Sequence, residues 1–252
     1  MSDGVYLLHY MNLKEVDMTD TILITGGAQR LGLAMALDLL AQSFRVIVTY
    51  RSERPALEEL RQAGAETVQC DFANNADITG LIQHISQSCE SLRAVIHNAS
   101  DWDAEKHTDD YPALLNKMMQ VHVSAPYQLN LGLKKLLLAH PTGADIIHMT
   151  DYVQTKGSSK HIAYSASKAA LHNLTLSFAQ ALAPQVKVNS IAPALLMFNE
   201  HDSDEYKARS LKKSLLEICP GAGEAVKAMN FLFASDFVTG QTMHLDGGRH
   251  LK

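Results

Sequence analysis

Cysteine is scarce in this sequence. Its 252 residues include three cysteines, Cys70, Cys89 and Cys219, which are odd in number, far apart and without a CxxC pair. That spacing excludes a regular disulfide framework and a cysteine-based metal site. The 12 histidines are scattered and form no HExxH motif, so we expect no metal site. So few cysteines favour a reducing compartment, and we expect a cytoplasmic protein.

Long apolar runs and an excess of positive charge are also missing. No run reaches the roughly 18–20 apolar residues of a membrane span, and residues 1–19 lack the pattern of an export signal. With 22 Lys+Arg against 27 Asp+Glu the net charge is -5, and no basic stripe is present to neutralise a phosphate backbone. We therefore expect neither a membrane nor a nucleic acid as a partner.

Short β-rich segments alternate with helical ones along the chain. Seven segments read as strands: 21–25, 45–50, 66–70, 93–98, 144–150, 186–192 and 241–245. Between them, apolar residues three and four apart predict helices that pack on a parallel sheet. No repeat or linker divides the chain, so residues 20–252 are predicted to form one doubly wound α/β domain of the Rossmann type, with a seven-stranded parallel sheet flanked by helices. Residues 1–19 read as an N-terminal extension, either disordered or the product of an early start codon.

The segment from Leu196 to Ala222 is the least regular part of the pattern. It follows the sixth predicted strand and is polar in its middle, NEHDSDEYKARS. Open α/β sheets bind ligands at the carboxyl ends of their strands, where this segment would lie. We expect it to be a mobile substrate lid.

A glycine-rich turn follows the first strand directly. Thr25 to Gly32 reads TGGAQRLG and leads into a helical run. Glycines at Gly26 and Gly32 would let the backbone approach a phosphate, which the amino end of the helix would then hold. The alternative is an ordinary tight turn. The position after the first strand favours phosphate binding.

The end of the second strand bears on the kind of dinucleotide. Arg51 and Ser52 stand where an acidic residue would accept from a ribose 2′-hydroxyl, whereas arginine would pair with a 2′-phosphate. A solvated surface arginine is the alternative. The residues favour NADPH as the coenzyme.

Tyr164 and Lys168 lie four residues apart in a helical run, YSASK, and therefore share a face. A nearby ammonium favours the phenolate, so we expect Lys168 to lower the pKa of Tyr164 and make its hydroxyl a usable proton donor. The alternative is an amphipathic helix with an exposed lysine.

Five motifs in order resemble the short-chain dehydrogenases/reductases over Thr21 to Leu251: TGGAQRLG, CDF (70–72), HNAS (97–100), YSASK and NSIAP (189–193). The resemblance implies that Asp71 and Phe72 flank the adenine, that the HNAS segment passes beneath the coenzyme, and that Lys168 also holds the nicotinamide ribose. It further implies a homotetramer. The coenzyme residues carried over are Gly26, Gln29, Arg30, Leu31, Gly32, Arg51, Ser52, Asp71, Phe72, Asn98, Ala99, Ser100, Tyr164, Lys168 and Pro193.

Asp151 stands where most of this family places a catalytic serine, and Ser158 and Ser159 are less suitably placed. Taken alone, Asp151 would be expected to cap a turn. An Asp–Tyr–Lys set instead resembles the pteridine reductases, whose pattern also carries an aromatic residue where Trp102 stands. We therefore predict Asp151, Tyr164 and Lys168 as catalytic, and Trp102 as a platform for a flat pterin ring rather than a core aromatic. The predicted substrate-binding residues are Arg30, Ser100, Trp102, Asp151 and Tyr164.

His122 occupies a position where many members of the family have asparagine, which holds a water in the proton relay. A role for the imidazole in that relay and a satisfied core histidine are both open.

Three functions fit these residues. The leading prediction is NADPH-dependent reduction of the C=N bond of a dihydropterin, with dihydrofolate as a further substrate. The alternatives are a carbonyl or 3-oxoacyl thioester reductase, which Asp151 and Trp102 disfavour, and a non-catalytic dinucleotide-binding regulator, which Tyr164 and Lys168 disfavour.

Overall fold

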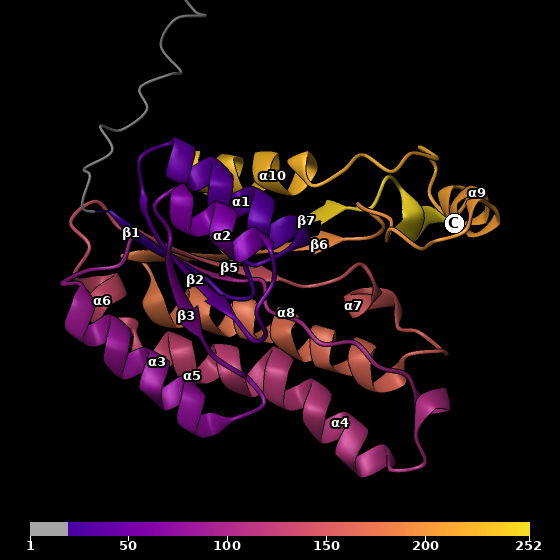
Figure 1. Ribbon diagram of the computed structural model, residues 1–252, viewed down its shortest axis with the longest axis horizontal. Helices are drawn as coiled ribbons and strands as arrows, with labels where there is room; N and C mark the ends of the chain where they lie inside the picture. The colour runs from indigo at the N-terminus through magenta and orange to yellow at the C-terminus, as the bar shows by residue number, and fades with distance from the viewer. Residues whose placement is uncertain (1–19) are drawn as a thin grey trace, which may run out of the picture.

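A computed structural model describes residues 20–252 and builds them around one parallel sheet (Figure 1). The seven strands are β1 (Thr21–Ile24), β2 (Arg45–Tyr50), β3 (Glu66–Gln69), β4 (Ala94–His97), β5 (Ala144–Met149), β6 (Val186–Pro193) and β7 (Thr242–Leu245). Each predicted strand is present, with ends that differ by one residue at most. The predicted α/β fold with a seven-stranded parallel sheet is therefore confirmed. The predicted extension, residues 1–19, lies outside the described residues.

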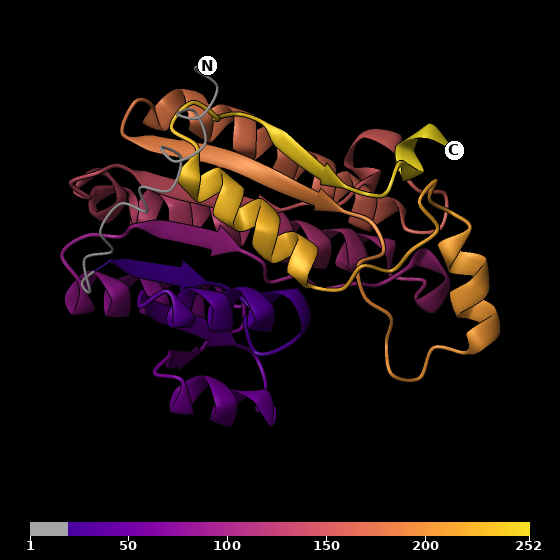
Figure 2. The ribbon, with the colours of Figure 1, turned by 90° about the horizontal axis from the view of Figure 1, so that it is seen from above.

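Helices cover both faces of the sheet. Figures 1 and 2 show α1 (Arg30–Ala41), α2 (Ala56–Gln62) and α10 (Gly223–Ala234) on one face, and α3 (Asn75–Ser88), α5 (Ala125–Gly132) and α8 (Ile162–Leu182) on the other. The shorter elements are η1 (Glu105–His107), α4 (Tyr111–Met119), η2 (Gln120–Ser124), α6 (Lys134–Leu138), α7 (Val153–Lys156), α9 (Asp204–Leu211) and η3 (Arg249–Leu251). Within residues 20–252, no helix combines the length and the apolar character that crossing a bilayer requires.

The core consists of aliphatic side chains on both faces of the sheet. Leu23 of β1 lies opposite Ile47 of β2 and Val95 of β4, and all three are fully buried. Strands covered on both faces in this way are the expected result of parallel pairing through crossover helices. One cluster of core residues joins the sheet to α1, α2 and α10, and a second joins it to α3, α5 and α8.

The strand order creates a crevice beside β1. The order is β3-β2-β1-β4-β5-β6-β7, so the chain builds outward from β1 in one direction and returns to its other side with β4. The loops after β1 and β4 therefore diverge, and ligands of doubly wound sheets bind at such a point. Figure 2 shows α9 and the C-terminal segment lying beyond the ends to which the strand arrows point.

Helix α1 has no side-chain cap at its start, unlike α3 and α4. The Asn74 side chain accepts from the Ala76 N–H at the start of α3, and the Asp110 side chain accepts from the Ala113 N–H at the start of α4. Gln29, in the same position before α1, is extended and provides no side-chain cap. The first N–H groups of α1 are thus available to an anion, in the crevice beside β1.

Candidate active site

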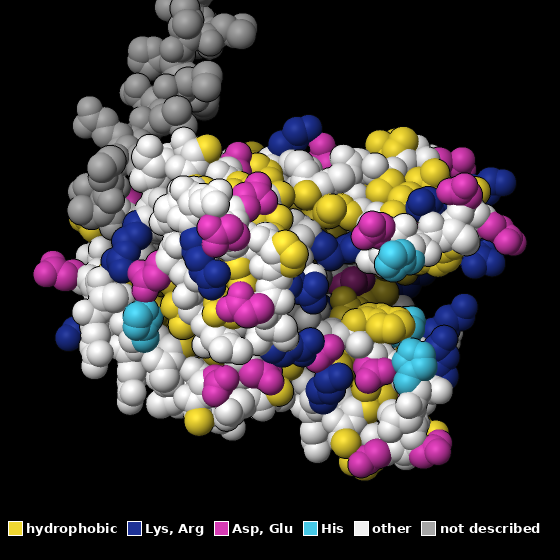
Figure 3. Space-filling view, viewed as in Figure 1, with side chains coloured by type: hydrophobic (Ala, Val, Ile, Leu, Met, Phe, Trp, Pro, Cys, Tyr) yellow, Lys and Arg dark blue, Asp and Glu magenta, His cyan; other side chains and the backbone are white. Residues whose placement is uncertain are grey.

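A cleft of about 550 Å³ opens at the carboxyl edge of the sheet. Its size falls in the range of ligand pockets, roughly 300–1,000 Å³. Figure 3 shows the hollow on the face viewed there. Every predicted site residue except Gly32 lines it: Gly26, Gln29, Arg30, Leu31, Arg51, Ser52, Asp71, Phe72, Asn98, Ala99, Ser100, Trp102, Asp151, Tyr164, Lys168 and Pro193. Residues that the sequence patterns did not single out also line it, among them Arg54 and Asp101.

The glycine-rich turn has the shape of a phosphate cradle. Gly26 has a φ of +64°, and a Cβ there would lie 2.8 Å from Ala99 Cα. Gly32 does not line the cleft, but a Cβ on it would lie 2.5 Å from Asn98 Nδ2, so α1 packs directly against the turn. Asn98 Nδ2 donates to the Gly26 carbonyl over 2.8 Å and holds the turn in place. Both glycines are needed for this backbone, which leaves room that a side chain would fill.

Polar and aromatic residues after β2 and β3 form the next part of the cleft. Asp71 is fixed by the Ala73 N–H, which donates to its Oδ1 over 3.0 Å, and Phe72 is buried beside it. The Arg51 side chain reaches from the end of β2 to the loop after β4, where Nη1 lies 3.0 Å from Asp101 Oδ2. The guanidinium therefore already binds an anionic group, supplied by the protein itself.

Asp151, Tyr164 and Lys168 meet at the ends of β5 and α8. The Tyr164 hydroxyl donates to Asp151 Oδ2 over 3.0 Å. The Lys168 ammonium donates to the Met149 carbonyl over 2.9 Å and lies 5.7 Å from the centre of the Tyr164 ring. Asp151 Oδ1 accepts from the Val153 N–H over 3.0 Å. Asp151 thus caps a turn with one oxygen and faces the cleft with the other, so the two interpretations of its role are compatible.

The ionisation of this group differs from the sequence-based prediction. Burial, and then the neighbouring Asp151 carboxylate, raise the pKa of Tyr164 well above its usual value. The expectation that Lys168 lowers it is therefore wrong in this geometry, because the acidic neighbour and desolvation outweigh the ammonium. Burial also raises the pKa of Asp151 and lowers that of Lys168 from 10.5 to about 8. Tyr164 consequently keeps its proton at neutral pH. Lys168 titrates at a pH only slightly above neutral.

Trp102 lies at the outer part of the cleft. Its side chain is 54% exposed, which excludes a core aromatic. The ring is 4.9 Å from that of His161 and 5.9 Å from that of His107, measured between centroids. Both histidines were missed in the sequence, since neither belongs to a motif and each comes near Trp102 only through the fold. They hold the indole at the rim while leaving surface for a ligand.

His122 connects the Ser100 loop to α8. The imidazole is buried; its Nε2 lies 2.9 Å from Ser100 Oγ and accepts from the Asp101 N–H over 3.2 Å. Because Ser167 Oγ donates to the Tyr164 carbonyl, His122 Nδ1 must donate to Ser167 Oγ, 2.8 Å away. Both ring nitrogens are thus occupied, and burial lowers the pKa of His122 to about 2. The interpretation as a satisfied histidine fits this site better than a proton-carrying one.

Arg30 is tied to the predicted lid. It has a φ of +52°, and its guanidinium donates to Asn199 Oδ1 over 2.6 Å and to the Met197 carbonyl over 3.1 Å. The segment closes at its base, where the Gly221 N–H donates to the Leu196 carbonyl over 2.8 Å. The structure places this segment beside the cleft, as expected, and its mobility stays a prediction.

The sheet, the glycine-rich turn and the Tyr164–Lys168 pair define an oxidoreductase of the doubly wound α/β class. A family model described as enoyl-(acyl carrier protein) reductase matches residues 26–250. The chain belongs to the short-chain dehydrogenase/reductase family, and the resemblance in its motifs is confirmed.

The names of individual similar proteins are more specific than the description of the family. Dihydromonapterin reductases from two Escherichia coli strains, O6:K15:H31 and O1:K1, are each 51% identical to this chain over 232 residues, covering 92% of it and 97% of the relative. Among solved structures, alternative dihydrofolate reductase 1 from Brucella canis, complexed with NADP, has a TM-score of 0.83 at 29% identity and covers 93% of this chain and 95% of its own. The Brucella suis protein, also in complex with NADP, has the same TM-score and identity and is covered over 96% of its chain.

Proposed function

We propose that this protein is an NADPH-dependent reductase of dihydropterins, which converts 7,8-dihydromonapterin to tetrahydromonapterin and also accepts dihydrofolate. One observation carries the proposal: a single cleft joins a glycine-lined cradle to an Asp151–Tyr164 hydrogen bond and an exposed Trp102. The relatives named for dihydromonapterin and dihydrofolate reduction support the same substrates.

The residues of the cleft fit the coenzyme. The backbone at Gly26 and the uncapped start of α1 suit a pyrophosphate, and Arg51 with Ser52 suits a 2′-phosphate. Lys168 would hold the nicotinamide ribose. When bound, NADPH supplies the hydride of the reaction. The protein's part is to orient the two reactants and to deliver the proton.

Proton delivery is assigned to Tyr164. Its hydroxyl keeps its proton at neutral pH and faces the cleft, with Asp151 as its hydrogen-bond acceptor. A proton leaving Tyr164 toward N5 of a dihydropterin would create a phenolate, which the Lys168 ammonium near the ring stabilises. Asp151, whose pKa is raised by burial, can take up a proton from solvent and pass it to the phenolate along the same hydrogen bond.

Substrate recognition is assigned to the outer half of the cleft. A pterin is flat and carries donors and acceptors around its edge, so its binding requires both an apolar face and polar partners. Trp102 offers the face, and the polar groups of Ser100, Asp151 and Tyr164 line the same cleft. Arg30 lines it too, although its guanidinium contacts the lid segment, and it joins substrate to lid in this proposal.

Reduction of the ketone of a 3-oxoacyl thioester is the main competing function. Tyr164 and Lys168 would serve a ketone equally well, whereas Asp151 and Trp102 suit a planar polar ring. Oxidation of NADPH should therefore be followed with dihydromonapterin, with dihydrofolate and with a 3-oxoacyl thioester. Turnover of the dihydropterins is the expected result. Turnover of the thioester alone would overturn the pterin assignment, and binding of NADPH without turnover of any substrate would favour a non-catalytic regulator.

We also infer a homotetramer in the cytoplasm. Two apolar surfaces on opposite faces of the sheet support the assembly, since a dimer of dimers needs two different self-complementary interfaces. Tyr127 and Leu131 of α5 are about half exposed, as is Phe231 of α10, and Phe237 is fully exposed. The three cysteines are free thiols, in keeping with a reducing compartment. Analytical ultracentrifugation would test the assembly.

A further inference from the structure

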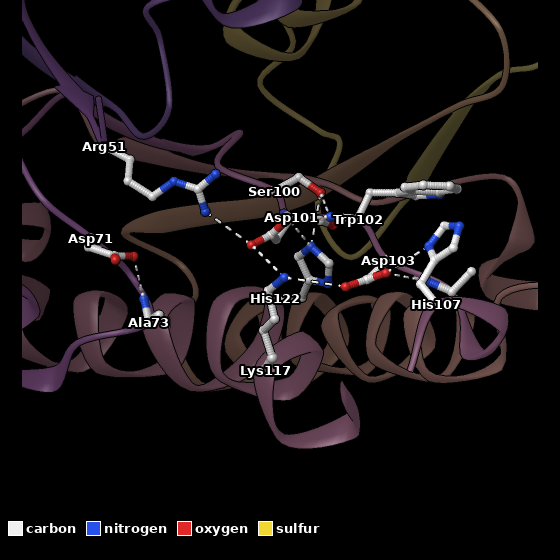
Figure 4. A network of polar contacts seen from close by, with 11 residues as sticks. Arg51, Asp71, Ala73, Ser100, Asp101, Trp102, Asp103, His107, Lys117 and His122 are labelled. Atoms are coloured by element: carbon white, nitrogen blue, oxygen red, sulfur yellow. Dashed lines mark hydrogen bonds and ion pairs between the residues drawn. The ribbon is translucent and has the colours of Figure 1, made fainter. Parts of the chain in front are cut away.

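Asp101 contacts both halves of the cleft, although no sequence pattern singled it out. Its Oδ2 lies 3.0 Å from Arg51 Nη1 and 3.4 Å from Lys117 Nζ, and its Oδ1 accepts from the Trp102 N–H over 2.8 Å. Its own N–H donates to His122 Nε2. Figure 4 shows Arg51 reaching toward the carboxylate and Lys117 rising toward it from α4.

The Arg51–Asp101 ion pair lies beside the predicted binding site of the coenzyme. Arg51 follows β2 and Asp101 lies beyond β4, and β1 with its glycine-rich turn stands between these strands. Both residues line the same cleft as that turn. Neighbouring strands are about 4.8 Å apart, so the ion pair spans about two strand spacings directly beside the phosphate cradle. A dinucleotide in the cleft and this ion pair therefore meet.

The guanidinium of Arg51 is a group that either of two anions could bind, the Asp101 carboxylate or a coenzyme phosphate. Within residues 20–252, Asp101 is the only side chain that pairs with it, and the Arg51 side chain is 59% exposed. A carboxylate and a phosphate bind a guanidinium by the same planar, charge-assisted geometry. Solvent reaches the guanidinium, although the Asp101 side chain is only 16% exposed. Ion pairs that are open to solvent contribute little, so a phosphate dianion can replace the carboxylate.

Asp101 does not lose all its partners when Arg51 leaves. Lys117 remains near Oδ2, and the Trp102 N–H remains on Oδ1. The exchange therefore leaves no carboxylate without a cation, and the loop that carries Trp102 keeps its hydrogen bond. Arg51 can alternate between two anions while the substrate side of the cleft stays in place.

We propose that Asp101 is an internal competitor of the coenzyme 2′-phosphate for Arg51, and so a residue that sets coenzyme affinity and speeds release of NADP⁺. This inference rests on the proposed use of NADPH. The carboxylate occupies Arg51 before the coenzyme binds, and it takes Arg51 back as NADP⁺ leaves. The effect is confined to coenzymes that carry a 2′-phosphate, because NAD⁺ has no group that needs Arg51.

The test is the affinity for NADP⁺ and for NAD⁺, measured by calorimetry at one ionic strength. Asp101→Asn keeps an oxygen for the Trp102 N–H but removes the charge that holds Arg51. NADP⁺ should bind about two- to fivefold more tightly, the range expected for an exposed ion pair, and should dissociate correspondingly more slowly in stopped-flow. The affinity for NAD⁺ should not change.

Two controls separate competition from a general change of charge. Asp103→Asn removes a neighbouring carboxylate that pairs with Lys117 and not with Arg51, and should leave the affinity for NADP⁺ unchanged. In an Arg51→Ala background, Asp101→Asn should no longer strengthen NADP⁺ binding. Weaker NADP⁺ binding by Asp101→Asn would overturn the proposal and make Asp101 a support for Arg51 instead. Equal gains for NADP⁺ and NAD⁺ would overturn it as well.

These measurements use no pterin. Their outcome is therefore independent of whether dihydropterins are reduced, and a protein that fails the reductase assay can still show the competition. If the unmodified protein binds NADP⁺ and NAD⁺ equally, the coenzyme assignment fails at that first step, before Asp101 is changed.

Discussion

The Tyr164 hydroxyl donates to Asp151 Oδ2 over 3.0 Å, so the proton donor of the proposed reaction rests on a carboxylate and not on the serine that is usual in this family. A carboxylate can accept the phenolic proton or, once protonated, return one. A serine hydroxyl cannot hold the extra proton. This difference gives the site its own dependence on pH and on substitution.

Replacement of Tyr164 by phenylalanine should remove most turnover. The general acid contributes about 10²–10⁴-fold to such reactions, and the phenylalanine would offer no proton while keeping a ring beside Lys168. The affinity for NADPH should change little. Steady-state assays with dihydromonapterin, together with calorimetry for NADPH, provide the measurement.

Tyr152→Phe is the matched control for that variant. Tyr152 stands next to Asp151, and its ring packs under Arg249 at 4.2 Å, a contact that phenylalanine retains. Its activity should equal that of the unmodified protein. Undiminished turnover by Tyr164→Phe would exclude Tyr164 as the donor, whereas a mild loss with dihydropterins alone would point to water as the proton source.

Lys168 should give the reaction a basic limit near pH 8. Burial lowers the pKa of this lysine from 10.5 to about 8, so the ammonium that stabilises a phenolate is lost as the pH rises through that value. We expect kcat/KM for the dihydropterin to be constant below about pH 8 and to fall above it. The pKa of Tyr164 lies well above its usual value, so titration of this tyrosine should not change kcat/KM in this pH range.

Lys168→Arg identifies the group responsible for that limit. Arginine stays charged at every accessible pH, so the limb near pH 8 should vanish in the variant even if its activity is lower throughout. Circular dichroism checks that the variant is folded. A limb that remains at the same pH would assign it to another group and contradict the prediction.

Asp151→Asn should stabilise the protein while impairing catalysis. Burial raises the pKa of Asp151 in the folded state, so the stability linked to this group is present at low pH and is lost as the pH rises through the folded-state pKa. At pH 9 the carboxylate is charged and Lys168 is largely neutral, which makes the charge most costly. Asparagine can still accept from the Val153 N–H and avoids that cost.

Thermal unfolding followed by circular dichroism measures the effect. The midpoint should rise by a few degrees at pH 9, since about 1 kcal/mol corresponds to about 2–4 °C in a domain of this size. The rise should shrink at lower pH. Asp109→Asn, at an exposed position, should leave the midpoint unchanged. A destabilised Asp151→Asn variant at pH 9 would refute the account.

The fold was predictable because its signals are local. Each strand is a short aliphatic run between turns, so every strand was located to within one residue, and the glycines of the first turn follow directly from its close contacts. Many of the residues lining the cleft were predictable for a different reason, although Arg54 and Asp101 were not. These residues follow the ends of parallel strands, which all meet at one edge of the sheet.

Contacts between distant segments were not predictable. The pairing of Arg51 with Asp101 and the packing of His161 on Trp102 join residues 50 and 59 positions apart, and no spacing rule in a single sequence reports such pairs. The pKa of Tyr164 was predicted in the wrong direction for a related reason. The spacing to Lys168 is visible in the helix, whereas the desolvation and the approach of Asp151 exist only in the fold.

The last prediction concerns Trp102 and distinguishes a pterin site from a ketone site. Stacking of a base-like ring on an aromatic side chain contributes about 1–3 kcal/mol, and it should hold the substrate and the transition state about equally. Trp102→Ala should therefore raise KM for dihydropterins about five- to 150-fold with little change in kcat, and Trp102→Phe should recover most of the loss. Tyr111→Ala, on α4 outside the cleft lining, controls for loss of an exposed ring. A KM that stays the same in Trp102→Ala would remove Trp102 from the substrate site and, with it, the main structural reason for preferring a planar ring to a small ketone.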